Sequence, residues 1–333
     1  QENFRGYLVG DYDGTPKTAE WASAICGTPV EDIRWFAETV GKDHKVMLMH
    51  NYALARCASA DNIPQLFMTM GAMGGHMGKS GHACGGAYKT YAGAGGPALV
   101  KFGETGLPAT KNALADTMPE PLMWQCIREG RYNSTGAAYG VNFNAEDIKE
   151  TEFKWLNIEG RNTLQTAVGL SDAREAIQKL DFVTDLAYTF DTSAAYADIV
   201  LPCATEWERV GGFAGHQRSR ETVVVYSRVT EPLWEAKTEF EIGRMLAARL
   251  GMDPDELWPI TEEQAFFNQI VGCTYVDAAG EEKPLVTITA DDIAKWGVDA
   301  EPQEGDIALD DFLSAGCYTV KRAEGDGYSY IGY

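Results

Sequence analysis

The chain has 333 residues, enough for about two domains at roughly 100–200 residues per domain. Hydrophobic residues make up 45% and charged residues 23%, and the 49 acidic and 28 basic residues give a net charge of −21. This acidity leaves no basic footprint for nucleic acid, and no apolar run approaches the ~18–20 residues of a spanning helix, so we expect neither a nucleic-acid partner nor direct membrane insertion.

The first third of the chain has the pattern of an α/β unit. Thr28 can cap a helix whose first position suits Pro29, with Glu31 closing a capping box. Residues 45–50 are apolar and indicate a buried strand, and residues 60–73 have apolar positions on one helical face. Helix, strand and helix in this order are typical of a parallel α/β sheet.

Residues 71–97 contain ten glycines. Glycine permits positive φ and lets the backbone approach a ligand closely. A flexible surface loop explains the glycines equally well, although the segment also carries Met, Tyr, His and Cys.

A second unit of the same kind follows an irregular stretch over residues 101–150. Residues 153–158 indicate a strand, and Ser171 can cap the helix after it. Strands are predicted at 182–188 and 198–202, the second closed by Pro202.

The remainder of the chain is predicted to be a helix followed by short pieces. Thr238–Glu241 is another capping box and opens a helix to Leu250. In the string of short elements after residue 251, Thr289 caps a helix that Gly297 ends. Gly, Pro and Asp between these elements are typical of a segment that wraps other domains. The fold class expected is therefore α/β, with Rossmann-like parallel-sheet units and an irregular C-terminal segment.

The cysteines and histidines show no metal-ligand spacing. The seven cysteines form no CxxC pair, which favours buried free thiols in a reduced or anaerobic setting over a disulfide framework or a metal cluster. The five histidines are equally scattered, so we expect no metal site built from this chain alone. The N-terminus is neither a start methionine nor a signal peptide, which predicts a processed product or an internal fragment.

Candidate chemistry lies at strand ends. The sequence has no GxSxG elbow, HExxH motif, P-loop or dinucleotide fingerprint. In open α/β sheets ligands bind outside the carboxyl ends of strands, here at His50–Asn51, at Gly160–Thr163 and over 186–192. Backbone amides there suit a phosphate, and Asp185 or Asp191 can pair with the two adjacent N–H donors of a guanine edge.

Several motifs occur in an order that resembles the dimethyl-sulfoxide-reductase family of molybdopterin oxidoreductases. The segment Ala197–Pro202, followed by Ala204–Glu208, resembles a hallmark motif of this family. Asp13–Ala22 resembles the family's DG-x-x-KTPEWA, and Gly75–Gly81 resembles its GN-x-G-x-PG loop. Gly160–Asn162 resembles G-x-NP, and the EAK element before a helix is matched at residues 231–238.

The resemblance implies a cofactor and a domain map. It implies a bis-molybdopterin guanine dinucleotide with Mo or W, and two-electron oxygen-atom transfer or reductive dehydroxylation of a small-molecule substrate. Residues 1–100 would be the C-terminal half of one Rossmann-like domain and 101–250 half of a second cofactor-binding domain. Residues 251–333 would pack on the iron–sulfur or a neighbouring domain. The metal ligand and the 4Fe-4S cysteines would lie in a missing N-terminal part, leaving the fragment inactive, and a ferredoxin-like iron–sulfur electron-transfer subunit would be the partner.

The resemblance also implies site residues. The glycine-rich loop would lie near the metal, which makes His82, Tyr88, Lys89 and Tyr91 candidate catalytic residues, with a Tyr or His as proton donor to a leaving hydroxyl. The alternative is that these side chains only pack the loop. The implied cofactor-binding residues are His50, Asn51, Arg56, Gly160, Asn162, Thr163, Asp185, Asp191 and Thr192. The family's aspartate eleven residues before Asp198 is Ala187 here, so guanine recognition is expected at Asp185 or Asp191.

Two other functions are compatible with the pattern. One is a non-catalytic relative that serves as a scaffold in an electron-transfer complex. The other is a nucleotide-binding α/β dehydrogenase, which the missing glycine fingerprint disfavours. The substrate and the compartment, extracytoplasmic or the cytoplasm of an anaerobic bacterium, stay open.

Overall fold

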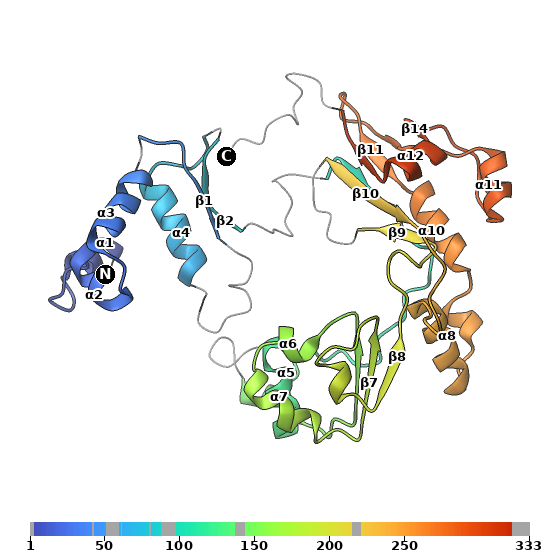
Figure 1. The fold of residues 1–333 in the computed structure, drawn as a ribbon, viewed down its shortest axis with the longest axis horizontal. Coiled ribbons are helices and arrows are strands. Elements are labelled where there is room, and N and C mark those ends of the chain that lie inside the picture. The colour runs from blue at the N-terminus through green and yellow to red at the C-terminus, as the bar shows by residue number, and fades with distance from the viewer. Residues whose placement is uncertain are drawn as a thin grey trace. The chain divides into compact units, whose positions relative to one another are not determined.

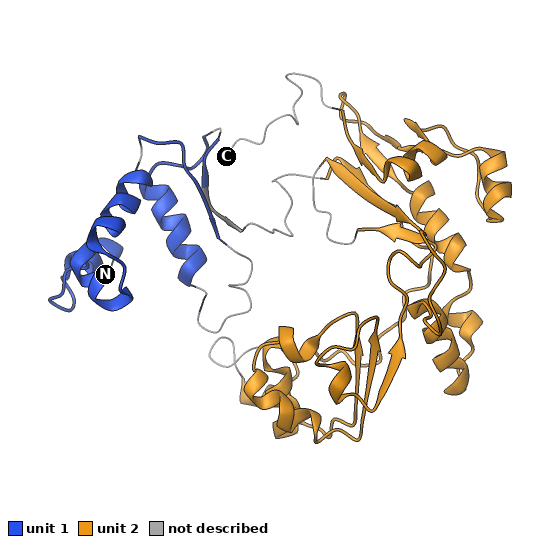
Figure 2. Cartoon of the chain, in the orientation of Figure 1, with its two compact units in different colours: residues 1–90, 331–333 blue, residues 91–330 orange. Residues whose placement is uncertain are grey.

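The computed structural model describes residues 3–41, 43–50, 60, 62–79, 81–87, 98–136, 144–214 and 221–321. The chain divides into two compact units, residues 1–90 with 331–333 and residues 91–330 (Figure 2). The three-part division by function remains a prediction.

The described residues of unit 1 form four helices and two parallel strands. The helices are α1 (Phe4–Val9), α2 (Ala19–Cys26), α3 (Val30–Thr39) and α4 (Asn62–Met73). Strand β1 (Met47–His50) pairs in parallel with β2 (Ala83–Ala87), and α4 contacts both strands. The predicted strand at 45–50 and helix at 60–73 are confirmed, but the predicted burial of the strand is wrong, because Met47 and Met49 are exposed.

The predicted capping box before α3 is wrong. Pro29 occupies the N-cap position and no side chain caps the helix. The helix begins one residue later than the pattern suggested, so Thr28 lies outside it, and proline offers no side-chain acceptor.

One part of unit 2 is organised around a three-stranded parallel sheet. Its strands, in the order β6-β7-β8, are β6 (Trp155–Glu159), β7 (Phe182–Ala187) and β8 (Ile199–Pro202) (Figure 1). The connections contain α6 (Thr163–Thr166), α7 (Leu170–Ile177) and the 3-10 turn η4 (Ala194–Tyr196). The α/β class and the three predicted strands are therefore confirmed.

Two local details of this sheet region differ from the prediction. Ser171 does not cap α7. Gly169, at φ +80°, occupies the N-cap position, so Ser171 lies inside the first turn of the helix. The stretch 101–150 contains an unpredicted helix, α5 (Met123–Glu129), and the hairpin strands β4 (Arg131–Asn133) and β5 (Ile148–Glu150), with the 3-10 turns η2 (Glu120–Leu122) and η3 (Ala145–Asp147). Trp124 of α5 is fully buried against α7 and the sheet.

The other described residues of unit 2 include short strands and five further helices. An antiparallel sheet has the order β15-β10-β9, from β9 (Gly211–Phe213), β10 (Thr222–Ser227) and β15 (Cys317–Thr319). A second joins β3 (Val100–Lys101), β11 (Thr274–Val276) and β12 (Glu282–Pro284), and β13 (Val286–Thr287) pairs with β14 (Ile307–Ala308). The helices are α8 (Glu239–Arg249), α9 (Pro254–Leu257), α10 (Glu262–Val271), α11 (Ala290–Trp296) and α12 (Leu309–Ala315).

The predicted caps in this region are present. Thr238 and Glu241 form a reciprocal capping box on α8. Thr289 caps α11, and Gly297 ends it at φ +65°. Although the elements after residue 251 are short, as predicted, they do more than wrap, because Phe267, Phe312 and neighbouring residues form the larger hydrophobic core of the described unit. None of the helices among the described residues is long and apolar enough to cross a membrane.

Candidate cofactor-binding site

Two cavities adjoin at the carboxyl edge of the β6-β7-β8 sheet. The smaller has a volume of about 100 Å³ and is lined by Gly160, Arg161, Asn162, Asp185, Leu186, Ala187, Tyr188, Thr189 and Asp191. The larger, of about 380 Å³, is lined by Gly160, Leu186, Tyr188, Cys203, Ala204, Thr205, Glu206, Trp207, Arg209 and Glu239. They share Gly160, Leu186 and Tyr188, so together they form one site at the edge where open α/β sheets bind ligands.

Ser193 holds the rim of the smaller cavity together. Its hydroxyl is fully buried and donates to Asn162 Oδ1 over 2.9 Å, and it accepts from the backbone N–H of Leu164 over 3.0 Å. Thr163, buried as the first residue of α6, follows Asn162 directly. The bond therefore joins the turn after β6 to the connection between β7 and β8.

Asp191, Asn162 and Thr192 have hydrogen-bond partners in the protein. Asp191 Oδ1 accepts from the backbone N–H groups of Ser193 (2.8 Å) and Ala194 (3.0 Å). Gln165 links the other two: its Nε2 donates to Thr192 Oγ1 over 3.0 Å, and its Oε1 accepts from Asn162 Nδ2 over 2.9 Å. These contacts shape the loop.

Asp185 differs from Asp191 in that one of its buried carboxylate oxygens lacks such a partner among the described residues. It is 2% exposed, and its Oδ2 has no hydrogen-bond partner in the described part of the chain. Burial raises the pKa of this carboxyl to about 6, and the charge of Asp191 adds to the rise. A buried carboxylate oxygen without a donor is costly, so a ligand that donates hydrogen bonds into the cavity would stabilise it.

The larger cavity brings together residues that the sequence analysis missed. Arg209 pairs with Glu239 at the start of α8, and its Nη2 lies 3.3 Å from the carbonyl oxygen of Ala204. Burial, followed by the charge of Glu239, raises the pKa of the Cys203 thiol to about 12, so this cysteine stays protonated and unreactive. Arg209 follows the hallmark motif directly, which was the one signal that could have identified it.

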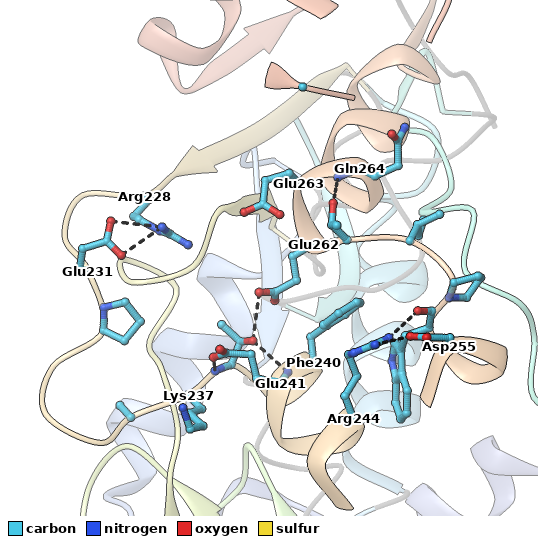
Figure 3. Close-up of a pocket in the computed structure, with 18 residues that line it drawn as sticks. Arg228, Glu231, Lys237, Phe240, Glu241, Arg244, Asp255, Glu262, Glu263 and Gln264 are labelled. Carbon is cyan, nitrogen blue, oxygen red and sulfur yellow. Dashed lines mark hydrogen bonds and ion pairs between the residues drawn. The ribbon is translucent and has the colours of Figure 1, made fainter. Parts of the chain in front are cut away.

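A third hollow, larger than both, lies between the loop before α8 and helices α8 to α10 (Figure 3). Its volume is about 820 Å³. Most of its charged side chains are satisfied within the protein: Arg228 pairs with Glu231, Arg244 pairs with Asp255, and Glu262 accepts from Thr238 Oγ1 over 3.0 Å. We therefore place the candidate site at the sheet edge, where a buried acceptor lacks a donor.

Unit 1 contains two further predicted residues. His50 ends β1, with its ring edge-on to Phe67 at a centroid distance of 5.8 Å. His82 precedes β2, with its Nδ1 2.9 Å from His76 Nδ1. Five other predicted residues lie outside the described residues, namely Asn51, Arg56, Tyr88, Lys89 and Tyr91.

The sequence comparison decides the family. Residues 32–249 match the molybdopterin oxidoreductase family. The chain belongs to this family.

The similar proteins are reductases of the dimethyl-sulfoxide type, which confirms the resemblance found in the sequence. The chain is 29% identical to dimethyl sulfoxide/trimethylamine N-oxide reductase of Cereibacter sphaeroides, covering 74% of this chain and 30% of that protein. It is 26% identical to trimethylamine-N-oxide reductase of Haemophilus influenzae, covering 88% and 37%. The chain thus spans about a third of these relatives. Among solved structures, acetylene hydratase from Pelobacter acetylenicus aligns with a TM-score of 0.38 at 17% identity, covering 64% of this chain and 22% of that one.

Membership in the molybdopterin oxidoreductase family implies a molybdopterin cofactor with molybdenum. The residues at the sheet edge fit an organic group with N–H donors, because Asp185 offers a buried oxygen that the described protein leaves unpaired. The described residues contain no group of three or more His, Cys, Asp or Glu side chains arranged to hold a metal ion.

Proposed function

We propose that this molybdopterin oxidoreductase chain is part of the catalytic subunit of a molybdenum or tungsten bis-pterin enzyme. The reaction proposed is two-electron oxygen-atom transfer or reductive dehydroxylation of a small molecule. The relatives described above are reductases of a sulfoxide and an N-oxide, which supports oxygen-atom chemistry. A 4Fe-4S cluster elsewhere in the subunit and a ferredoxin-like partner belong to the same proposal.

The proposal for this chain rests on Asp185, because its buried carboxylate oxygen has no hydrogen-bond donor among the described residues. A guanine edge presents an N–H and an adjacent amino group, and an ionised carboxylate can accept from both. Adenine presents a donor beside an acceptor, which a carboxylate satisfies less well. We infer that the smaller cavity receives the guanine of the dinucleotide form and that Asp185 selects it.

The larger cavity would hold the charged part of the same group. The Arg209 guanidinium borders it, and guanidinium groups suit phosphate oxygens. Gly160 borders both cavities at φ +61°, and a Cβ at this position would meet no atom within 4 Å. The backbone there can approach a ligand closely. When bound, the metal–pterin group supplies the redox chemistry, while these residues bind and orient it.

The test uses the full-length subunit, in which molybdenum, tungsten, iron and acid-released guanine nucleotide are quantified. We expect metal with two guanine nucleotides per metal in the wild type. Asp185→Asn replaces one carboxylate oxygen by an amide that repels the guanine donors, so we expect nucleotide content to fall by half or more. Asp181→Asn is the matched control, because Asp181 is exposed before β7 at the opposite end of the strand.

Two results would count against the proposal in different ways. Full-length protein without metal and nucleotide would overturn the enzyme assignment and favour the non-catalytic scaffold. Full nucleotide content in Asp185→Asn would leave the enzyme assignment standing but remove Asp185 from guanine recognition.

A further inference from the structure

His76 is a buried histidine with partners on both ring nitrogens. Its side chain is 1% exposed, its Nε2 lies 2.7 Å from the carbonyl oxygen of Val40, and its Nδ1 lies 2.9 Å from Nδ1 of His82. The two rings are stacked, with centroids 5.1 Å apart. His76 therefore connects the end of α3 to the residue that precedes β2.

The hydrogens of this pair follow from the chemistry of the partners. A carbonyl oxygen can only accept, so Nε2 of His76 carries a hydrogen. In a neutral His76 ring Nδ1 is then an acceptor, and the hydrogen of the 2.9 Å contact belongs to Nδ1 of His82. The other assignment needs a buried His76 cation, which burial penalises.

The surroundings of His82 also favour a neutral ring. Burial lowers the pKa of His82, and the positive charges of Lys79 and Lys45 lower it further. Since Nδ1 carries the hydrogen, Nε2 of His82 keeps its lone pair. That atom has no hydrogen-bond partner among the described residues, and the ring is half-buried.

The backbone around His76 is built to admit its ring. A Cβ on Gly74 would lie 2.6 Å from His76 Nε2 and 2.5 Å from the Val40 carbonyl oxygen, closer than real Cβ atoms approach. The His76 N–H donates to the Gly71 carbonyl over 2.8 Å, which fixes the residue to the last turn of α4. Glycine at position 74 is thus required for the His76–Val40 contact.

We propose that His76 is a positioning residue that holds His82 in the Nδ1–H tautomer, so that His82 presents a bare Nε2 to a ligand that carries an O–H or N–H donor. A bare Nε2 accepts a hydrogen bond, which reverses the donor role predicted for His82. The tautomer is independent of the proposed function.

The tautomer is tested by ¹⁵N NMR of the histidine rings in the 333-residue chain, with His82 assigned from the spectrum of His82→Gln. We expect His82 as the neutral Nδ1–H form near pH 7.5. His76→Asn keeps an acceptor near the Nδ1 position and should retain this form, whereas His76→Leu removes it and should shift His82 to a mixture with the Nε2–H form. The exposed His44 provides the control His44→Gln, which should leave His82 unchanged.

A wild-type His82 in the Nε2–H form overturns the positioning role, and this spectrum suffices if His76→Leu does not fold.

Discussion

Ser193 and Asn162, which are 31 residues apart, are joined by a 2.9 Å hydrogen bond that the serine hydroxyl donates to the side-chain oxygen Oδ1 of the asparagine. The bond connects the turn after β6 with the turn that leads to β8. It places Gly160, Asp185 and Asp191 around one cavity, although no short sequence motif contains all three.

Removing the Ser193 hydroxyl should destabilise this edge of the sheet. Ser193→Ala leaves the Leu164 N–H and Asn162 Oδ1 without their partner in a buried place, which costs about 1–3 kcal/mol. Urea unfolding of the chain measures the loss. Ser171→Ala, at an exposed position of α7, should change the stability by less than about 0.5 kcal/mol. Equal stability of the two variants would contradict the role of Ser193.

Asp185 should make the unliganded chain less stable as the pH rises. Its pKa in the folded state is about 6, above the ordinary 3.8, so the folded state binds the proton more tightly than the unfolded state does. The contribution of protonated Asp185 to the free energy of unfolding is complete below pH 4 and is lost as the pH rises through 6. Ionisation thus costs on the order of 3 kcal/mol at pH 7. Asp185→Asn, neutral throughout, should gain stability relative to wild type over this range.

The measurement is urea unfolding from pH 4 to 7.5. A constant difference between Asp185→Asn and wild type across this range would show that Asp185 titrates normally. Asp181→Asn should show no such divergence, because Asp181 is exposed.

Glu208 should have the opposite pH dependence. Its Oε2 accepts from the backbone N–H and hydroxyl of Thr205, and its Oε1 accepts from the Leu233 N–H over 2.9 Å. These bonds, led by that of the Thr205 N–H, lower its pKa, so the stabilisation is present above pH 4.5 and is lost as the pH falls through the lower folded value. Glu208→Gln should be less stable than wild type at pH 7.

The deficit of Glu208→Gln should shrink as the pH falls below 4.5, where wild-type Glu208 is protonated as well. Thermal unfolding at pH 7 and at pH 3.5 measures it. Glu206→Gln, at an exposed position, serves as the control. A Glu208→Gln deficit that is the same at both pH values would show that the charge of Glu208 contributes nothing.

Gly74→Ala should disturb His76 without altering its chemistry. The added Cβ would overlap the Val40 carbonyl oxygen and the His76 ring, at a cost of about 1–3 kcal/mol. The His82 tautomer should change as in His76→Leu. Ala72→Gly, on the exposed side of α4, should cost up to about 1 kcal/mol but leave the tautomer unchanged. An unchanged His82 spectrum in a folded Gly74→Ala protein would show that Gly74 is not required for the pair.

Much of the local structure was predictable from the sequence because it depends on near neighbours. The capping boxes at Thr238 and Thr289 involve residues three positions apart, and the strands at 182–187 and 199–202 follow from short apolar runs. The family followed from motifs in a fixed order, of which the segment from Ala197 to Glu208 is the clearest. At Thr28 and Ser171 the same local reasoning failed, because a neighbouring Pro29 or Gly169 started the helix instead.

What only the tertiary structure decided was which polar side chains have partners. Asp185 and Asp191 were equivalent candidates in the sequence, but only Asp185 keeps a buried oxygen without a donor. The pairing of Arg209 with Glu239 joins residues 30 positions apart, and that of His76 with Val40 joins residues 36 positions apart. Burial and hydrogen bonding at such distances depend on how the elements pack, whereas caps and strands depend on the residues beside them.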